Sequence, residues 1–119
     1  TVRLKVGGAF HSPFMEEAAR GLSGYMAQLA FAAPRIPLYA NTNAEPYGDA
    51  AELLALQVKT PVRWQRTIER LIEEGYTDFI EVGAGKTLTG FMGKIDGTKR
   101  ALHVENQETL AAALAALKE

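Results

Sequence analysis

Cysteine is absent from the 119 residues of this chain. Its absence excludes a disulfide scaffold, a thiolate metal site and a cysteine nucleophile. A chain without disulfides fits the cytosol, and we expect a cytoplasmic protein. Histidine is scarce as well: the only two, His11 and His103, stand far apart in the sequence. Such a pair is a poor zinc-binding set, so we expect no metal.

Long apolar runs and an excess of one charge are also missing. No run approaches the ~20 apolar residues that cross a bilayer, so no membrane partner is expected. Thirteen basic and fourteen acidic residues give a formal net charge of −1, without a basic patch that would favour nucleic acid. The chain lacks an initiator Met and opens in a strand-like pattern, so we expect it to be part of a longer polypeptide.

Patterns typical of strands and of helices alternate along the chain. The expected strands cover residues 2–6, 36–40, 79–82 and 101–104. One expected helix begins at Ser12-Pro13, and another begins at Thr60-Pro61 and ends at Gly75. The other expected helices cover residues 49–58, 87–95 and 108–117. Strands that alternate with helices favour parallel pairing, with the helices packed against the sheet. We therefore predict an α/β fold with a mainly parallel sheet flanked by helices.

The segment Gly-Ala-Phe-His-Ser-Pro-Phe-Met, residues 8–15, carries the clearest chemical signal. His11 directly precedes Ser12 and Pro13, which fit the cap and first position of a helix. The positive end of a helix favours an uncharged imidazole, which can take a proton from a nucleophile and return it to a leaving group. The alternative is a loop histidine that is hydrogen-bonded to backbone, and position alone leaves both open.

A nucleophile to match this base is not evident. The chain has two serines, Ser12 and Ser23. A serine elbow on an α/β sheet reads Gly-x-Ser-x-Gly, and around Ser23 the second glycine is replaced by Tyr25. Ser12 is better explained as a helix cap. The chain therefore offers a candidate base without its partner.

Gly83-Ala-Gly-Lys-Thr87 invites a phosphate-loop interpretation. That motif requires a glycine five residues before Gly85, where Ile80 stands, so the spacing fails. A tight turn that brings a helix close to the sheet is the favoured interpretation. His103, within an expected strand, is interpreted as structural.

Four segments in order resemble the C-terminal part of malonyl-CoA:acyl-carrier-protein transacylases. They are residues 8–15, Pro34-Arg-Ile-Pro-Leu with Asn41-Thr-Asn-Ala-Glu-Pro46, Thr60-Pro-Val-Arg-Trp64, and Phe79-Ile-Glu-Val-Gly-Ala-Gly-Lys-Thr-Leu88. One departure is Ala84, where that family usually has proline. The resemblance implies a three-layer α/β fold, part of a hydrolase-like large subdomain. It implies that residues 1–6 return from a small ferredoxin-like subdomain and that 7–119 form the C-terminal part of the acyltransferase catalytic domain.

The resemblance also implies an activity and its residues. In such enzymes an elbow serine takes malonyl from coenzyme A and passes it to acyl carrier protein in fatty-acid biosynthesis, without a metal or redox cofactor. His11 matches the base of that reaction, and the position of Gln57 matches the residue whose backbone carbonyl orients it. Phe10 matches a residue that goes with malonyl rather than methylmalonyl, because its ring leaves little room for a branching methyl. The serine, the carboxylate-binding arginine and the oxyanion loop would come from the remainder of the transacylase chain.

Two other functions stay open at this stage. The chain could be a small α/β module that binds a partner through its Gly83–Gly85 turn, or a hydrolase that uses water as acceptor. A fragment of a transacylase, unlike a complete module, should expose an apolar patch where the rest of the sheet would lie.

Overall fold

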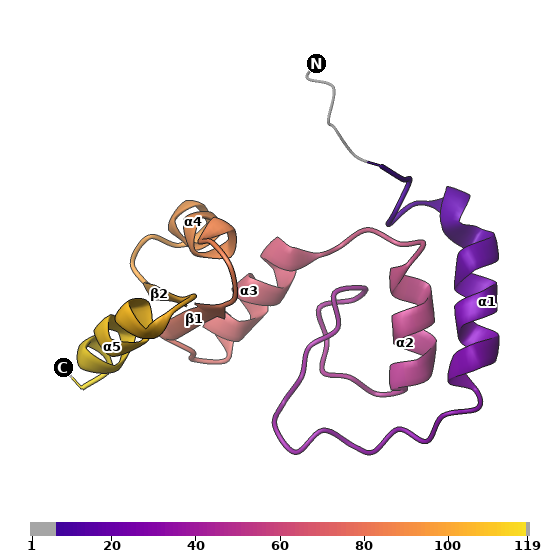
Figure 1. Ribbon diagram of the computed structural model, residues 1–119, viewed down its shortest axis with the longest axis horizontal. Coiled ribbons are helices and arrows are strands. Elements are labelled where there is room, and N and C mark those ends of the chain that lie inside the picture. The colour runs from indigo at the N-terminus through magenta and orange to yellow at the C-terminus, as the bar shows by residue number, and fades with distance from the viewer. Residues whose placement is uncertain (1–6, 119) are drawn as a thin grey trace. The chain divides into compact units, whose positions relative to one another are not determined.

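The computed structural model describes residues 7–118 and divides into two compact units, residues 1–67 and 68–119 (Figure 1). The strand expected over residues 2–6 lies outside the described residues. The boundary between the two units falls within helix α3 (Trp64–Glu73). No helix of the described residues is long and apolar enough to cross a membrane.

The first unit is built on two helices that pack side by side, α1 (Glu16–Met26) and α2 (Ala50–Gln57) (Figure 1). Each helix contributes a buried alanine, Ala19 on α1 and Ala55 on α2. Small side chains at a helix contact let the two backbones approach closely. Asp49 caps α2, because its carboxylate accepts a hydrogen bond from the backbone N–H of Glu52 at 3.0 Å.

The strand predicted over 36–40 is wrong. Among residues 7–118, this segment contains one isolated antiparallel bridge, between Tyr39 and Pro46, within an otherwise irregular connection. Pro37 has no backbone N–H to donate to a ladder. The neighbouring turn forms instead, with the Ala40 N–H donating to the Glu45 carbonyl and the Ala44 N–H to the Ala40 carbonyl.

The second unit contains a parallel pair of strands, β1 (Asp78–Val82) and β2 (Arg100–Val104), joined by α4 (Thr87–Ile95) and followed by α5 (Gln107–Ala116). The pairing runs in register from Asp78 with Arg100 to Val82 with Val104. The parallel strand–helix–strand order predicted from the sequence is confirmed.

Helices lie on both faces of this strand pair. The Glu81 carboxylate bonds to the first turn of α4, and the Arg100 guanidinium donates to the Ala116 carbonyl at the end of α5. Successive side chains of a strand point to opposite faces of a sheet. Glu81 is paired with His103, so these two side chains share one face, and Arg100, three residues before His103, lies on the other face. α4 therefore packs on one face of both strands and α5 packs on the opposite face of β2, and the predicted α/β architecture with a helix-flanked parallel sheet is confirmed.

Gly75 ends α3, as the sequence predicts. Its φ is +96°, and the backbone N–H of Tyr76 donates to the Leu71 carbonyl while that of Gly75 donates to the Ile72 carbonyl. This pair of bonds is the Schellman arrangement, which requires a left-handed residue that glycine adopts at little cost.

Candidate active site

His11 is held by its backbone in an unusual conformation, with a φ of +61°. A residue with a Cβ pays steric energy in this left-handed region, so other contacts must hold it there. The backbone N–H of His11 donates to the Val58 carbonyl at 2.9 Å. The loop that carries the histidine is thereby attached to the segment that follows α2.

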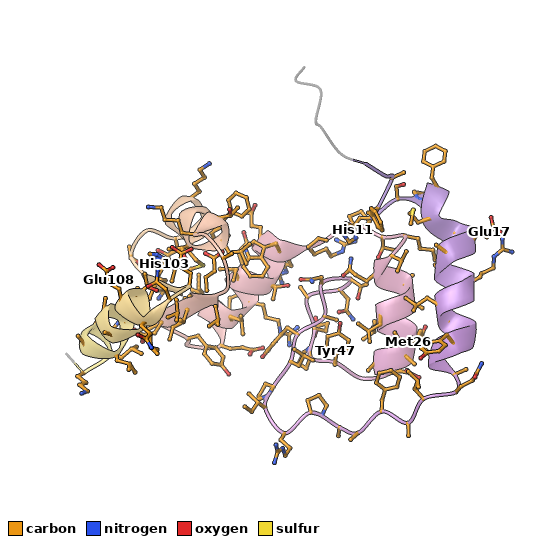
Figure 2. All side chains as sticks on the ribbon, in the orientation of Figure 1. His11, Glu17, Met26, Tyr47, His103 and Glu108 are labelled. Atoms are coloured by element: carbon orange, nitrogen blue, oxygen red, sulfur yellow. The ribbon has the colours of Figure 1, made fainter. Side chains whose placement is uncertain are left out.

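The imidazole ring is attached to the same segment. Nδ1 of His11 lies 2.9 Å from the backbone carbonyl oxygen of Gln57. His11 is labelled in Figure 2. A carbonyl oxygen can only accept, so Nδ1 carries the proton and donates it. In a neutral ring Nε2 then holds the free electron pair, on a residue that is exposed.

Gln57 is the last residue of α2, and this position explains why its carbonyl is available. The final carbonyls of a helix have no partner within the helix. Here the Gln57 carbonyl receives the imidazole, the Val58 carbonyl receives the His11 N–H, and the Leu56 carbonyl receives the Thr60 hydroxyl at 2.9 Å. The histidine therefore satisfies part of the C-terminus of α2.

The side chain of Gln57 stiffens this turn. Its Nε2 donates to the Thr60 carbonyl at 3.2 Å and lies 3.3 Å from Nδ1 of His11. The amide nitrogen is a donor, as is the protonated Nδ1, so the bond to the Thr60 carbonyl is the one that fits this tautomer. The side chain thus bridges the turn whose carbonyl faces the ring.

The segment after His11 differs in detail from the prediction. A short 3₁₀ turn, η1 (Pro13–Met15), precedes α1, and Pro13 takes its first position as expected. Ser12 takes the N-cap position, as predicted, but its side chain makes no capping hydrogen bond: its hydroxyl donates to the Ala9 carbonyl at 2.6 Å. A hydroxyl used in this way closes the loop around His11 instead of serving the helix.

Phe10 lies beside the histidine with 66% of its surface exposed. A Cβ built on Gly8 would lie 3.1 Å from the Phe10 ring, closer than ordinary van der Waals contact. A side chain at position 8 would therefore displace the ring. Phe14, in η1, is 89% exposed.

An ion pair that the sequence did not suggest joins the segment after His11 to the segment after Gln57. Lys59 Nζ is 2.8 Å from Glu16 Oε2, joining the first residue of α1 to the segment after α2. The hydrogen bond from Lys59 holds the pKa of the Glu16 carboxyl below its ordinary value of 4.5. The two residues are 43 positions apart, and no periodicity or motif links them.

Two backbone N–H groups of the Gly83–Lys86 turn in the second unit have partners within that unit. The Gly85 N–H donates to a Glu105 carboxylate oxygen at 2.8 Å, and the Gly83 N–H donates to the Val104 carbonyl. φ is +148° at Gly83 and +84° at Gly85, conformations open to glycine. The turn interpretation made from the sequence is confirmed.

Glu81 closes the start of α4. Its carboxylate accepts the backbone N–H of Leu88 at 3.2 Å, the backbone N–H of Thr89 at 2.7 Å and the Thr89 hydroxyl at 2.7 Å. The bond from the Thr89 backbone, with that from its hydroxyl and the nearby His103, holds the pKa of Glu81 below its ordinary value of 4.5. His103 thus belongs to the surroundings of a structural carboxylate.

This carboxylate predicts an acid-sensitive contribution to stability. A carboxyl whose pKa is lower in the folded state stabilises that state above the unfolded value, near pH 4.5, and loses this effect as the pH falls through the folded value. Glu81→Gln should lower the midpoint of thermal unfolding at pH 7 by a few degrees, and the difference from wild type should shrink at lower pH. Glu108→Gln, at an exposed position of α5, is the control; an equal loss in both variants would refute the specific role.

No family model matches the chain. The malonyl CoA-acyl carrier protein transacylase of Bacillus subtilis is 34% identical and aligns with 99% of this chain and 38% of its own length. The crystal structure of the transacylase of that name from Clostridium perfringens superimposes with a TM-score of 0.94 at 33% identity, over 98% of this chain and 38% of that one. The chain is homologous to part of the malonyl CoA-acyl carrier protein transacylases.

A third relative extends the set to a complex. In a structure described as a type II polyketide-synthase acyl-carrier protein with its malonyl-transacylase, the match has a TM-score of 0.90 and 30% identity, over 95% of this chain and 38% of that one. The chain thus spans about 38% of the length of the transacylases that it matches. The resemblance expected from the four sequence motifs is confirmed.

Proposed function

We propose that this chain is the C-terminal portion of a cytoplasmic transacylase that moves malonyl from coenzyme A to acyl carrier protein in fatty-acid biosynthesis. One observation carries the proposal: Nδ1–H of His11 is committed to the Gln57 carbonyl, which leaves an exposed Nε2 to act as a base. The kinship with transacylases supplies the reaction that needs such a base.

The exposed apolar surface of the strand pair supports the view that more of the sheet belongs to this protein. Ile80 is 43% exposed and Val82 79% exposed, although both lie within β1. A strand of a parallel sheet normally buries such residues on both faces. The patch expected of a transacylase fragment is therefore present in the second unit.

The reaction has two half-steps. Nε2 of His11 takes the proton of a serine hydroxyl supplied by the rest of the protein while the oxygen attacks the malonyl thioester carbon. The tetrahedral intermediate expels the coenzyme A sulfur, which receives that proton. The thiol of acyl carrier protein then gives its proton to Nε2 and attacks the acyl-serine, and the serine oxygen leaves and recovers the proton. No metal or redox cofactor is needed.

Gln57 takes the place that an acid occupies in a catalytic triad. Its carbonyl orients the ring and selects the tautomer without adding a full charge. When Nε2 takes a proton in this reaction, the Gln57 carbonyl still accepts the bond from Nδ1. Phe10, next to His11, is proposed to favour malonyl over methylmalonyl.

The acceptor is proposed from a relative. One homologous structure is described as a complex of an acyl-carrier protein with its malonyl-transacylase. That complex contains a type II polyketide-synthase acyl-carrier protein, whereas the Bacillus subtilis relative is a malonyl CoA-acyl carrier protein transacylase. The shared acceptor class is acyl carrier protein in both settings.

The proposal is tested with the complete protein that contains these residues. Incubation with malonyl-CoA should give a malonyl-serine enzyme, seen by intact mass, and addition of acyl carrier protein bearing its phosphopantetheine thiol should discharge it to malonyl carrier protein. Release of free malonate at the same rate with or without carrier protein would indicate a hydrolase. A protein that never becomes acylated would point to a binding module.

A further inference from the structure

We propose that the Glu16–Lys59 ion pair is a positioning pair that holds His11 against the last carbonyls of α2. This inference rests on the proposed function, because it assigns a role in placing the base. Neither residue touches the histidine ring by a hydrogen bond in the structure, so both would act through the segments that carry His11 and Gln57.

The pair is the third connection between the same two segments. The first is the His11 N–H to the Val58 carbonyl, and the second is Nδ1–H to the Gln57 carbonyl. Lys59 directly follows Val58, and Glu16 begins α1 after the η1 turn. The 2.8 Å contact of their charged groups therefore ties the far end of the His11 loop to the strip of backbone that receives the ring.

The packing of α1 on α2 extends from this contact. Ala19 lies one turn after Glu16, and Ala55 lies one turn before Lys59, and both alanines are buried. Glu16, Ala19, Ala55 and Lys59 line one groove between the two helices. The ion pair is thus the end of the α1–α2 contact that is nearest to His11 in the sequence.

Stability alone does not account for the pair. The side chains are 31% and 49% exposed, and exposed ion pairs contribute little to folding free energy. The pair can nevertheless affect the position of His11, because the left-handed backbone of this residue relaxes unless neighbouring contacts hold it. A displacement of about 1 Å at a catalytic group can cost about 100-fold in rate. A weak tie at this position can therefore have a measurable kinetic effect.

Arg20 provides a matched control for charge. It lies on α1 near Glu16 and acts on that carboxylate through its charge, whereas Lys59 makes the hydrogen bond. If only net charge near the groove mattered, removal of either cation would have the same effect. If the contact between Glu16 and Lys59 matters, removal of Lys59 should lower the rate and removal of Arg20 should not.

The experiment measures kcat and KM of the full-length protein for malonyl transfer to acyl carrier protein. Lys59→Met and Glu16→Gln should each lower kcat by about 5- to 20-fold, with KM for malonyl-CoA within about twofold of wild type. The exchanged pair Glu16→Lys with Lys59→Glu should recover kcat to within about threefold, as should Lys59→Arg. Arg20→Met should stay within about twofold. Circular dichroism and the thermal midpoint check that each variant is folded.

Two results would overturn the inference. One is an unchanged kcat in both single variants. The other is a raised KM in Lys59→Met that Glu16→Gln does not reproduce and that the exchanged pair does not repair, which would place Lys59 in contact with a substrate. Failure of the proposed function has a different signature: a His11→Ala enzyme would transfer malonyl to acyl carrier protein at the full rate.

Discussion

Replacing His11 with alanine should lower malonyl transfer by the complete protein by about 10²- to 10⁴-fold. The reason is that, in the proposed mechanism, the proton acceptor is the Nε2 electron pair that the Gln57 hydrogen bond leaves free. The measurement is the steady-state rate of malonyl carrier-protein formation, together with the single-turnover rate of enzyme acylation. Both half-steps of the proposed mechanism use the same nitrogen, so both rates should fall.

The backbone at this position gives a sharper control than alanine. His11 has a φ of +61°, a conformation that asparagine tolerates better than most residues. His11→Asn should therefore leave the thermal midpoint at or above that of His11→Ala, while its transfer rate is equally low. Near-wild-type acylation by either variant would show that the base is another group.

Replacing Phe10 with serine should shift acyl selectivity toward methylmalonyl-CoA by about tenfold or more in the ratio of kcat/KM values. A methyl group that clashes with a ring costs about 1–3 kcal/mol, and removing the ring removes that cost. Phe10 directly precedes His11, and its ring is 66% exposed, so it is free to face a bound acyl group. Competition between the two thioesters in one reaction gives the ratio directly.

Phe14→Ser is the matched control for this change. It removes an equally large aromatic side chain, 89% exposed, from the same loop region without altering the residue before His11. The control should leave the ratio within about twofold of wild type. Equal shifts in both variants, or none in Phe10→Ser, would remove Phe10 from the selectivity of the enzyme.

Local signals predicted much of the fold. Helix α4 matches the predicted range 87–95, and Gly75 ends α3 through the left-handed conformation that only the residue type suggested. The strand over 36–40 failed because Pro37 has no N–H to donate to a ladder and because, within residues 7–118, only Tyr39 and Pro46 pair there. Ser12 takes the predicted N-cap position before Pro13, but its side chain makes no capping hydrogen bond, and its hydroxyl donates to the Ala9 carbonyl.

The candidate site was only partly accessible from local patterns. They marked His11 as a histidine before a helix start, but its contact with Gln57 spans 46 positions and came from family resemblance. The Glu16–Lys59 pair had no signal of any kind, because both residues are ordinary charged surface positions in their own helices or turns. Long-range pairs become visible only when the packing of α1 on α2 brings their segments together.

The proposed mechanism depends on one proton, which lies on Nδ1 of His11 and not on Nε2. Nitrogen NMR of the full-length protein labelled with ¹⁵N-histidine distinguishes the two tautomers of a neutral ring, and His11→Asn identifies the signal. We predict that Nδ1 of His11 is protonated and that Nε2 is bare. A ring protonated on Nε2, with Nδ1 accepting from the Gln57 amide, would contradict the account.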